Sequence, residues 1–505
     1  MTEQIERGRI PDIVHGSPVA REGYGRVTPA VAEELRAIVG ARGVLSDPAD
    51  LATYAYDGTF LESPPDCVVL PESTAHVAAI MRLATAHRIP IVSRGAGSGL
   101  AGGTVPLAGG IVLSMVRMNR ILELDTVNMC ARVQPGVITG DLQKVVAAEG
   151  LLYPPDPASL RQSTIGGNVG MCAGGPKGLK YGVTKDFVLG LEAVLADGRV
   201  LRSGGKMIKN VTGYNLTQLF VGSEGTLGVV TEVILRLVPR PRASRTALAV
   251  FPRIDDAARI VTIILGAGIT PATIELMDRA SIRAVEDFKP FGLPTDAEAV
   301  LLIEVDGDES SVQANVREVG RLCEANGASE VRVATTAAES QTLWEARRAV
   351  SPSITRIRPT KLGEDISVPR SQIPAAVRAV QRIAERYNLP IPLYGHISDG
   401  NLHPNILFDR HDAAEVERVN AAAGEIFAAT VALDGTLTGE HGIGSLKKEY
   451  LASALDPVAL EMMRAIKAAF DPLNLLNPGK VFPSETAHQS PITRRSAPFV
   501  MDMVQ

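Results

Sequence analysis

Two histidines and a glutamate near the C-terminal end of the chain have the residue types and spacing of a metal site. His396 and His403 lie seven residues apart in GHISDGNLHPN, and the Asp-Gly-Asn turn between them can form a hairpin that brings the imidazoles together. Glu440 lies beside His441 in a second glycine-bracketed segment, GEHGIG. Two imidazoles and one carboxylate suit a borderline divalent ion such as Zn²⁺ and leave positions open for a substrate or water. The sequence therefore predicts metal-assisted chemistry at His396, His403 and Glu440.

Three glycine clusters in the first half of the chain predict a large diphosphate-bearing ligand. They lie in residues 91–106 (IVSRGAGSGLAGGTVP), 154–182 and 222–233. Without a Cβ, such loops let backbone N–H groups approach a diphosphate closely. The first loop matches G-x-G-x-x-G, but the residues after it, Thr104 to Pro106, cannot open the helix that a Rossmann site requires. One such loop would be explained as a turn without a ligand, whereas three loops that flank strands favour a bound cofactor.

The glycine clusters lie in residues 66–239, where short apolar runs predict an α+β domain. Residues 227–238 alternate with the period of a strand, and Asp197-Gly198 indicates a hairpin between two further strands. Pro239, Pro241 and several arginines change the composition, which indicates a domain boundary near residue 240.

The chain after residue 240 predicts a ferredoxin-like unit, because its elements follow the order strand, helix, strand, strand, helix, strand. The expected strands are residues 246–251, 273–277, 300–305 and 330–334, and the expected helices are residues 254–265 and 312–324. Three more helices are expected at residues 338–358, 373–387 and 413–433, and a strand pattern at residues 395–408 carries His396 and His403.

The composition and charge of the chain indicate which kinds of partner to expect. A net charge of −5 without a dense Lys/Arg block predicts no nucleic-acid partner, and no apolar run is long enough for a transmembrane segment. The N-terminus lacks the apolar region of a secretory signal, so we expect a cytoplasmic protein, free or peripheral at the inner membrane face. The four cysteines are scattered and predict neither disulfides nor a cysteine-bound metal.

The glycine segments RGAGSGLAGG, IGGNVGMCAGG and GSEGTLGVVTEV resemble the flavin-binding segments of the vanillyl-alcohol-oxidase (PCMH-type) FAD superfamily. Within it the chain resembles the branch of D-lactate dehydrogenases, D-2-hydroxyglutarate dehydrogenases and the FAD subunit of glycolate oxidase. The resemblance covers residues 54–482 and implies an α+β, two-domain FAD-binding fold with a ferredoxin-like substrate (cap) domain. It also implies noncovalent FAD, because the first loop has Ser98, Gly99 and Leu100 where some members have a histidine that attaches the flavin.

With this resemblance we divide the chain into five parts. A flexible N-terminal tail (1–25) precedes the FAD-binding domain (26–240) and the cap domain (241–440), and a C-terminal segment (441–483) that returns to the FAD domain precedes a flexible tail (484–505). The resemblance implies that the residues which contact FAD are Arg94, Gly95, Ala96, Gly97, Ser98, Gly99, Leu100, Gly102, Gly103, Pro155, Asp156, Ser159, Ser163, Thr164, Gly166, Gly167, Asn168, Ala173, Gly174, Gly175, Tyr181, Gly182, Glu224, Gly225, Thr226, Gly228, Val229, Val230 and Asn477.

The C-terminal motifs also resemble those of the family, with Ser398 where the family usually has glycine. The resemblance implies that His396, His403 and Glu440 bind the metal and that His441 is the catalytic base. It further implies that Arg347 binds the substrate carboxylate, with Asn405, Ser351 and Lys361 as further substrate contacts. An arginine suits this role because its planar donors can pair with both carboxylate oxygens.

These residues predict a dehydrogenase that oxidises a small 2-hydroxy acid to the 2-oxo acid by hydride transfer to flavin N5. Two alternatives are an FAD-dependent transferase of the alkylglycerone-phosphate synthase type and a metal-dependent hydrolase. The electron acceptor stays open between a quinone, a cytochrome and an electron-transfer flavoprotein, and we expect a homodimer or a subunit of a complex. The sequence selects neither the particular hydroxy acid nor its enantiomer.

Overall fold

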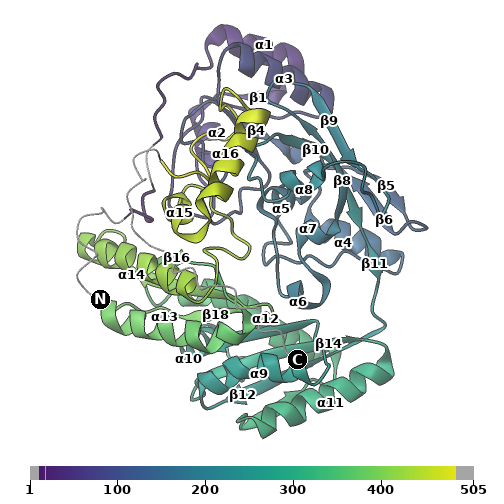
Figure 1. Cartoon of the computed structure of the whole chain (residues 1–505), viewed down its shortest axis with the longest axis vertical. Helices are drawn as coiled ribbons and strands as arrows, with labels where there is room; N and C mark the ends of the chain where they lie inside the picture. Colours follow the sequence, from purple (N-terminus) through teal and green to yellow (C-terminus); the bar gives the residue numbers. More distant parts are fainter. Residues whose placement is uncertain (1–10, 17–18, 485–505) are drawn as a thin grey trace, which may run out of the picture.

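The structure is a computed structural model that describes residues 11–16 and 19–484. Figure 1 shows two parts: an upper one formed by the N-terminal half together with the C-terminal segment, and a lower one formed by the green middle of the chain. Within the described residues, no helix is long and apolar enough to cross a membrane.

The upper part contains two main sheets. The first is the four-stranded sheet β1-β2-β4-β3, in which β2, β4 and β3 run parallel, and the second is the five-stranded antiparallel sheet β5-β6-β10-β8-β9. Their strands are β1 (Val44–Leu45), β2 (Cys67–Val69), β3 (Ile91–Arg94), β4 (Ile111–Ser114), β5 (Ile121–Asp125), β6 (Cys130–Val133), β8 (Val188–Val194), β9 (Val200–Gly204) and β10 (Val229–Arg236). Helix α3 (Thr74–Ala86) packs its buried residues in a core that both sheets share.

The remaining elements of the upper part are short. They are α1 (Pro29–Val39), α2 (Pro48–Thr53), α4 (Thr139–Ala148), β7 (Leu151–Leu152), α5 (Ile165–Met171), α6 (Gly178–Tyr181), α7 (Thr184–Phe187), α8 (Leu216–Phe220) and β11 (Val238–Pro239). The predicted hairpin at Asp197-Gly198 joins β8 to β9, and β10 alternates in burial as predicted. No helix follows the first glycine loop before β4, which confirms that the loop is not a Rossmann site.

The lower part is built on a second large sheet, of order β15-β12-β14-β13-β18-β19-β16, with β17 paired to β19. The strands are β12 (Ala243–Phe251), β13 (Thr273–Asp278), β14 (Ala299–Gly307), β15 (Glu330–Val333), β16 (Thr360–Gly363), β17 (Ile366–Ser367), β18 (Leu393–His396) and β19 (Asn401–Phe408). Its first four strands have the order fourth, first, third, second, which is ferredoxin-like, so the predicted fold class is confirmed.

Helices cover both faces of this sheet. Ala249 and Phe251 on β12 pack toward α9 and α11, whereas Leu248 and Val250 pack toward α10 and α12, because successive strand residues point to opposite faces. The helices are α9 (Ile254–Gly266), α10 (Arg279–Phe288), α11 (Glu309–Ala325), α12 (Ala337–Ile354), α13 (Ile373–Tyr387) and α14 (Ala413–Ala432). Helix α10 was not predicted, although the Asp278 side chain that accepts a hydrogen bond from the Ser281 N–H is an N-cap signal.

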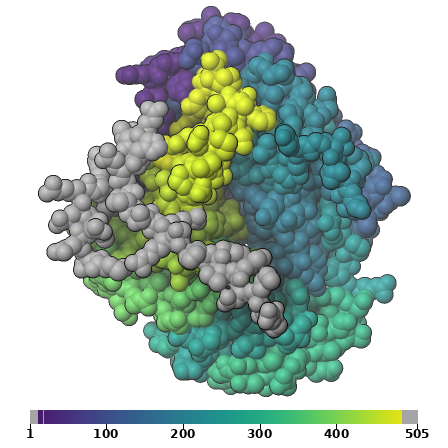
Figure 2. All heavy atoms as spheres, viewed as in Figure 1, coloured from purple at the N-terminus to yellow at the C-terminus, as the bar shows by residue number. Residues whose placement is uncertain are grey.

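After α14 the chain returns to the upper part through α15 (Leu451–Ala454) and α16 (Pro457–Phe470). Figure 2 shows this segment, in yellow, between the purple N-terminal region and the teal region. Lys467 on α16 is buried and donates hydrogen bonds to the carbonyls of Thr226 and Leu476. The return therefore fixes the C-terminal segment against the third glycine loop.

Part of the predicted N-terminal tail is packed, which differs from the prediction of a flexible segment. Ile13 and Val14 are buried, and the Asn420 side chain on α14 accepts hydrogen bonds from both of their N–H groups. The Tyr24 hydroxyl donates a hydrogen bond to the carbonyl of Asn474. The predictions for residues 1–10, 17–18 and 485–505 lie outside the described residues.

We predict that Phe408→Ala destabilises the protein by about 3–5 kcal/mol, because Phe408 is fully buried and packs edge-on against Phe60 of the other part. The measurement is the urea unfolding midpoint. Phe288→Ala is the control, since Phe288 is 52% exposed and should change stability far less. Equal shifts for the two variants would contradict the assigned core contact.

Candidate active site

The two histidines of the first C-terminal motif lie on adjacent strands of a hairpin. Tyr394 on β18 pairs with His403 on β19, and the rings of His396 and His403 lie 5.1 Å apart at 88°. The turn needs glycine at residue 400, where φ is +89° and a Cβ would lie 2.0 Å from the Val368 carbonyl oxygen. Ser398, which replaces the usual glycine, is not in the positive-φ region, so the hairpin accommodates it.

Glu440 completes the predicted group. Its Oε1 lies 3.4 Å from His396 Nε2 and 3.5 Å from His403 Nε2, and all three residues are largely buried. Burial raises the pKa of Glu440, but the charges of the two histidines outweigh it and lower the value to about 2. Burial and the neighbouring His396 lower the pKa of His403 to about 3. These distances bring Nε2 of His396, Nε2 of His403 and Oε1 of Glu440 close together.

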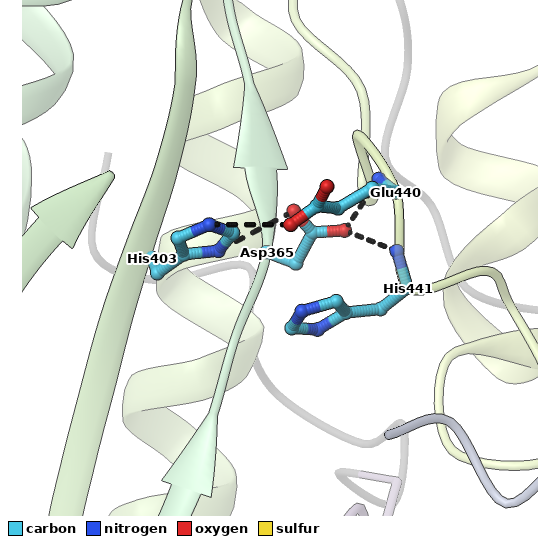
Figure 3. Close-up of side chains that lie close together, drawn as sticks. All are labelled: Asp365, His403, Glu440 and His441. Atoms are coloured by element: carbon cyan, nitrogen blue, oxygen red, sulfur yellow. Dashed lines mark hydrogen bonds and ion pairs between the residues drawn. The ribbon is translucent and has the colours of Figure 1, made fainter. Parts of the chain in front are cut away.

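Asp365, which the sequence analysis missed, holds the loop that carries Glu440 and His441. Its Oδ2 accepts hydrogen bonds from the Thr438 hydroxyl and from the N–H groups of Gly439, Glu440 and His441, at 2.7–2.9 Å. Its Oδ1 accepts one from Asn401 at 2.6 Å and lies 3.6 Å from His403 Nδ1. Figure 3 shows Asp365 between His403 and the loop. The carboxylate thus fixes the loop relative to the hairpin.

The donor set fits a divalent ion. In the described chain, ligand atoms of Asp365, His403, Glu440 and His441 all lie within 4.8 Å of one another. Asp365 already accepts five hydrogen bonds, however, whereas the Nε2 atoms of His396 and His403 both face Glu440 Oε1. The chemistry of the donors thus favours His396, His403 and Glu440, a nitrogen and oxygen set that Zn²⁺ accepts.

His441 connects the group of His396, His403 and Glu440 with a large cavity of the upper part. Its ring stacks on that of His403, with centroids 5.4 Å apart and planes 8° apart. Its Nδ1 is buried and has no hydrogen-bond partner among the described residues. Both Glu440 and His441 line the cavity, whose other walls are formed mostly by the three glycine loops.

The cavity brings together most of the residues predicted to bind FAD. Those in its wall are Arg94, Gly95, Ala96, Gly97, Ser98, Gly99, Leu100, Gly103, Ser159, Ser163, Thr164, Gly166, Gly167, Asn168, Ala173, Glu224, Gly225, Gly228, Val229 and Val230. Gly99 and Gly170 show how the wall suits a bulky ligand, since a Cβ at either would meet no protein atom within 4 Å. The predicted residues outside the wall are Gly102, Pro155, Asp156, Gly174, Gly175, Tyr181, Gly182, Thr226 and Asn477.

Several residues outside the wall have other contacts. Asn477 donates hydrogen bonds to the carbonyls of Gly103 and Glu224, and the Tyr181 hydroxyl donates one to Asp306 of the lower part. A Cβ at Gly174 would lie 2.9 Å from Glu440 Oε2, which places this glycine directly beside Glu440. These residues support the loops and the contact between the two parts.

Part of the cavity wall was not predicted from the sequence. The missed residues are Asp57, Ser93, Thr104, Met115, Pro135, Pro157, Ala158, Gly170, Met171 and Ser223. Asp57 is buried, its Oδ2 has no hydrogen-bond partner in the described chain, and burial raises its pKa. Ser93, Thr104, Pro157, Ala158 and Gly170 lie inside the recognised motifs, so proximity in sequence could have found them, whereas Asp57, Met115 and Pro135 carry no local signal.

The four predicted substrate contacts lie on three elements, α12, β16 and β19. Arg347 on α12 pairs with Glu275, and its guanidinium lies 4.8 Å from the centroid of the Tyr394 ring. Lys361 on β16 donates a hydrogen bond to Ser351 on α12 at 2.7 Å. Asn405 lies on β19 two residues after His403, so both side chains point to the same face of the sheet.

Matches to family models define the class of this protein as an FAD-binding oxidoreductase. Residues 65–204 match the FAD binding domain, and residues 240–481 match the C-terminal domain of FAD linked oxidases. The chain belongs to the FAD-linked oxidase family.

Relatives along nearly the whole chain support this membership. The chain is 47% identical to glycolate oxidase subunit GlcD of Bacillus subtilis, over 90% of this chain and 97% of the relative. It is 35% identical to a probable mitochondrial D-lactate dehydrogenase of Danio rerio, over 95% and 96% of the two chains. It is also 35% identical to a D-2-hydroxyglutarate dehydrogenase of Stutzerimonas stutzeri, over 90% and 99%.

Solved structures of more distant sequence share the fold. A 4-ethylphenol oxidase from Gulosibacter chungangensis has a TM-score of 0.76 at 21% identity, over 92% of this chain and 99% of that one. An alkyldihydroxyacetonephosphate synthase has a TM-score of 0.71 at 20% identity, over 94% and 90%. The fold thus occurs with different chemistries, so the reaction has to be argued from the site.

We predict that Gly170→Val weakens FAD binding at least about fivefold, because the side chain would project into the cavity and overpacking costs about 1–3 kcal/mol. Gly266→Val is the matched control, since Gly266 also lies in a helix with no protein atom within 4 Å of a Cβ but does not line the cavity. FAD content after gel filtration measures the effect. Full FAD occupancy in Gly170→Val would contradict the placement.

Proposed function

We propose that this protein is an FAD- and metal-dependent dehydrogenase that oxidises a small 2-hydroxy acid to the 2-oxo acid. One observation carries the proposal: the cavity walled by the flavin-type glycine loops ends at Glu440 and His441, beside His396 and His403. A hydride acceptor and a group of metal ligands would therefore serve one substrate. The named relatives act on glycolate, D-lactate or D-2-hydroxyglutarate, and these compounds share a carboxylate next to a hydroxyl-bearing carbon.

His396, His403 and Glu440 would hold the ion, with Zn²⁺ as the expected metal. A bound divalent ion supplies Lewis acidity, which lowers the pKa of a coordinated hydroxyl that is otherwise too weak an acid at neutral pH. Bound FAD supplies the acceptor for the hydride. His396, His403 and Glu440 would thus hold the metal, while other residues of the site would bind and orient the substrate.

His441 is the proposed base, because it lies in the cavity wall beside the metal ligands and its buried Nδ1 has no partner in the described part of the chain. It would take the hydroxyl proton and transfer it away from the site. Arg347 would bind the substrate carboxylate and Asn405 would help to orient it, with Ser351 and Lys361 nearby. The natural electron acceptor would be a quinone, a cytochrome or an electron-transfer flavoprotein.

Membership of the FAD-linked oxidase family disfavours a metal-dependent hydrolase, which would have no use for the flavin cavity. A transferase of the alkylglycerone-phosphate synthase type would share the fold but would not be reduced by a hydroxy acid.

We predict that the purified protein is yellow and that one or more of glycolate, D-lactate and D-2-hydroxyglutarate bleach the flavin under anaerobic conditions. Absorbance near the flavin maximum measures the reduction, and the L-enantiomers of lactate and 2-hydroxyglutarate are tested in parallel to determine which enantiomer is oxidised. Acid precipitation should leave the flavin in the supernatant, because the first loop offers no histidine for attachment. Flavin that no 2-hydroxy acid bleaches would favour the transferase.

We predict that two histidine variants lose activity for different reasons. His403→Ala should lose bound metal and nearly all turnover but keep FAD, since one of three ligands is removed. His441→Ala should keep metal and FAD but reduce the flavin about 10²- to 10⁴-fold more slowly, the usual cost of losing a general base. Elemental analysis and stopped-flow absorbance distinguish the two. Metal lost from His441→Ala and retained by His403→Ala would refute the assigned roles.

A further inference from the structure

Glu275 contacts two predicted site residues at once. It lies on β13, its side chain is completely buried, and its Oε1 is 2.7 Å from His396 Nδ1. Its Oε2 is 2.6 Å from a terminal nitrogen of Arg347. A buried carboxylate requires paired partners, and these two contacts supply them together with the Thr273 hydroxyl, which donates a hydrogen bond to Oε1 at 3.4 Å. Glu275 therefore joins a metal ligand to the residue proposed to bind the substrate carboxylate.

The contact with His396 decides which ring nitrogen is free. An ionised carboxylate only accepts hydrogen bonds, so His396 must carry a proton on Nδ1. The Nε2 atom, which lies 3.4 Å from Glu440 Oε1, is then the atom available to a metal ion. The neighbouring strands fix this arrangement, because Glu275 on β13 is paired directly with His396 on β18.

The contact with Arg347 decides which donors remain for a ligand. Glu275 Oε2 forms an ion pair with one terminal nitrogen, while Arg347 Nε is buried and has no hydrogen-bond partner in the described chain. The Tyr394 ring lies against the guanidinium and limits its movement. Arg347 is thus held in one orientation, and its buried Nε–H is free to donate a hydrogen bond. A buried donor without a partner is costly, so this arrangement is expected of a residue that binds a ligand with an acceptor group.

We propose that Glu275 is a positioning residue that orients His396 for the metal and Arg347 for the substrate carboxylate, so that one side chain sets the distance between the two. The inference rests on the proposed function. A glutamine at this position could satisfy only one of the two contacts. Its amide oxygen could accept a hydrogen bond from one partner, but its NH2 group would then face the N–H donor of the other partner. The loss of such an outer-shell carboxylate commonly weakens metal binding about 10- to 100-fold.

The test compares Glu275→Gln with Glu304→Gln. Glu304 lies on the adjacent strand β14, accepts a hydrogen bond from the Trp344 ring nitrogen and forms no hydrogen bond or ion pair with His396 or Arg347, so it is the matched control. Zn²⁺ affinity of the FAD-loaded protein is measured by competition with a chromogenic chelator, which needs no substrate. KM and kcat are then measured with the hydroxy acid that bleaches the flavin best.

We expect Zn²⁺ binding to weaken about 10- to 100-fold and KM to rise in Glu275→Gln, with FAD content unchanged and the control like the wild type. Wild-type Zn²⁺ affinity in Glu275→Gln would overturn the inference. If the wild type itself bound no Zn²⁺, the proposed function would fail instead. Should Glu275→Gln not fold, Glu275→Asp replaces it: the shorter side chain cannot span both contacts, so undiminished Zn²⁺ affinity there would equally overturn the inference.

Discussion

The buried carboxylate of Asp365 is the interaction on which the rest of the site depends. It accepts hydrogen bonds from three consecutive N–H groups and one hydroxyl of residues 438–441, and from Asn401 of the histidine hairpin. Burial raises the pKa of Asp365, but the charges of His441, Lys447 and His403 and these hydrogen bonds hold it well below its usual range. Because the carboxylate stays charged, a loop and a hairpin about 40 residues apart in sequence keep one relative position.

A second buried carboxylate holds the same loop from the opposite side. Glu224 of the third glycine loop accepts hydrogen bonds from the N–H groups of Ile443 and Gly444, each at 2.8 Å. Glu224 also lines the cavity, and burial raises its pKa to about 7. Residues 438–444 are thus bound by one carboxylate from each part of the molecule. The position of His441 relative to the cavity follows from both, so these contacts hold the flavin-type cavity and the group of His396, His403 and Glu440 in one relative position.

The features that could be predicted from the sequence are those that depend on local residue patterns. The ferredoxin-like strand order, the hairpin at Asp197-Gly198 and the turn between His396 and His403 all have local signals, and all are present. Asp365 and Glu275 could not be predicted in the same way, since each is one acidic residue whose role arises only when distant strands pair. Helix α10 was missed although its Asp278 cap was readable, because the ferredoxin pattern favoured a direct connection between the two strands. Long-range contacts, more than local propensity, determined what was missed.

The glycines around Glu440 and His441 serve close packing and not flexibility. A Cβ at Gly444, where φ is +53°, would lie 1.9 Å from the Ala101 carbonyl oxygen, and one at Gly442 would lie 2.4 Å from Met171. Larger residues would therefore push the loop away from both the cavity wall and the carboxylates that bind it. Side chains that take part in a reaction need fixed positions relative to the reacting atoms, and an error of about 1 Å can cost about 10²-fold in rate. The glycines of the GEHGIG motif thus allow the close packing that places His441 at the flavin-type cavity.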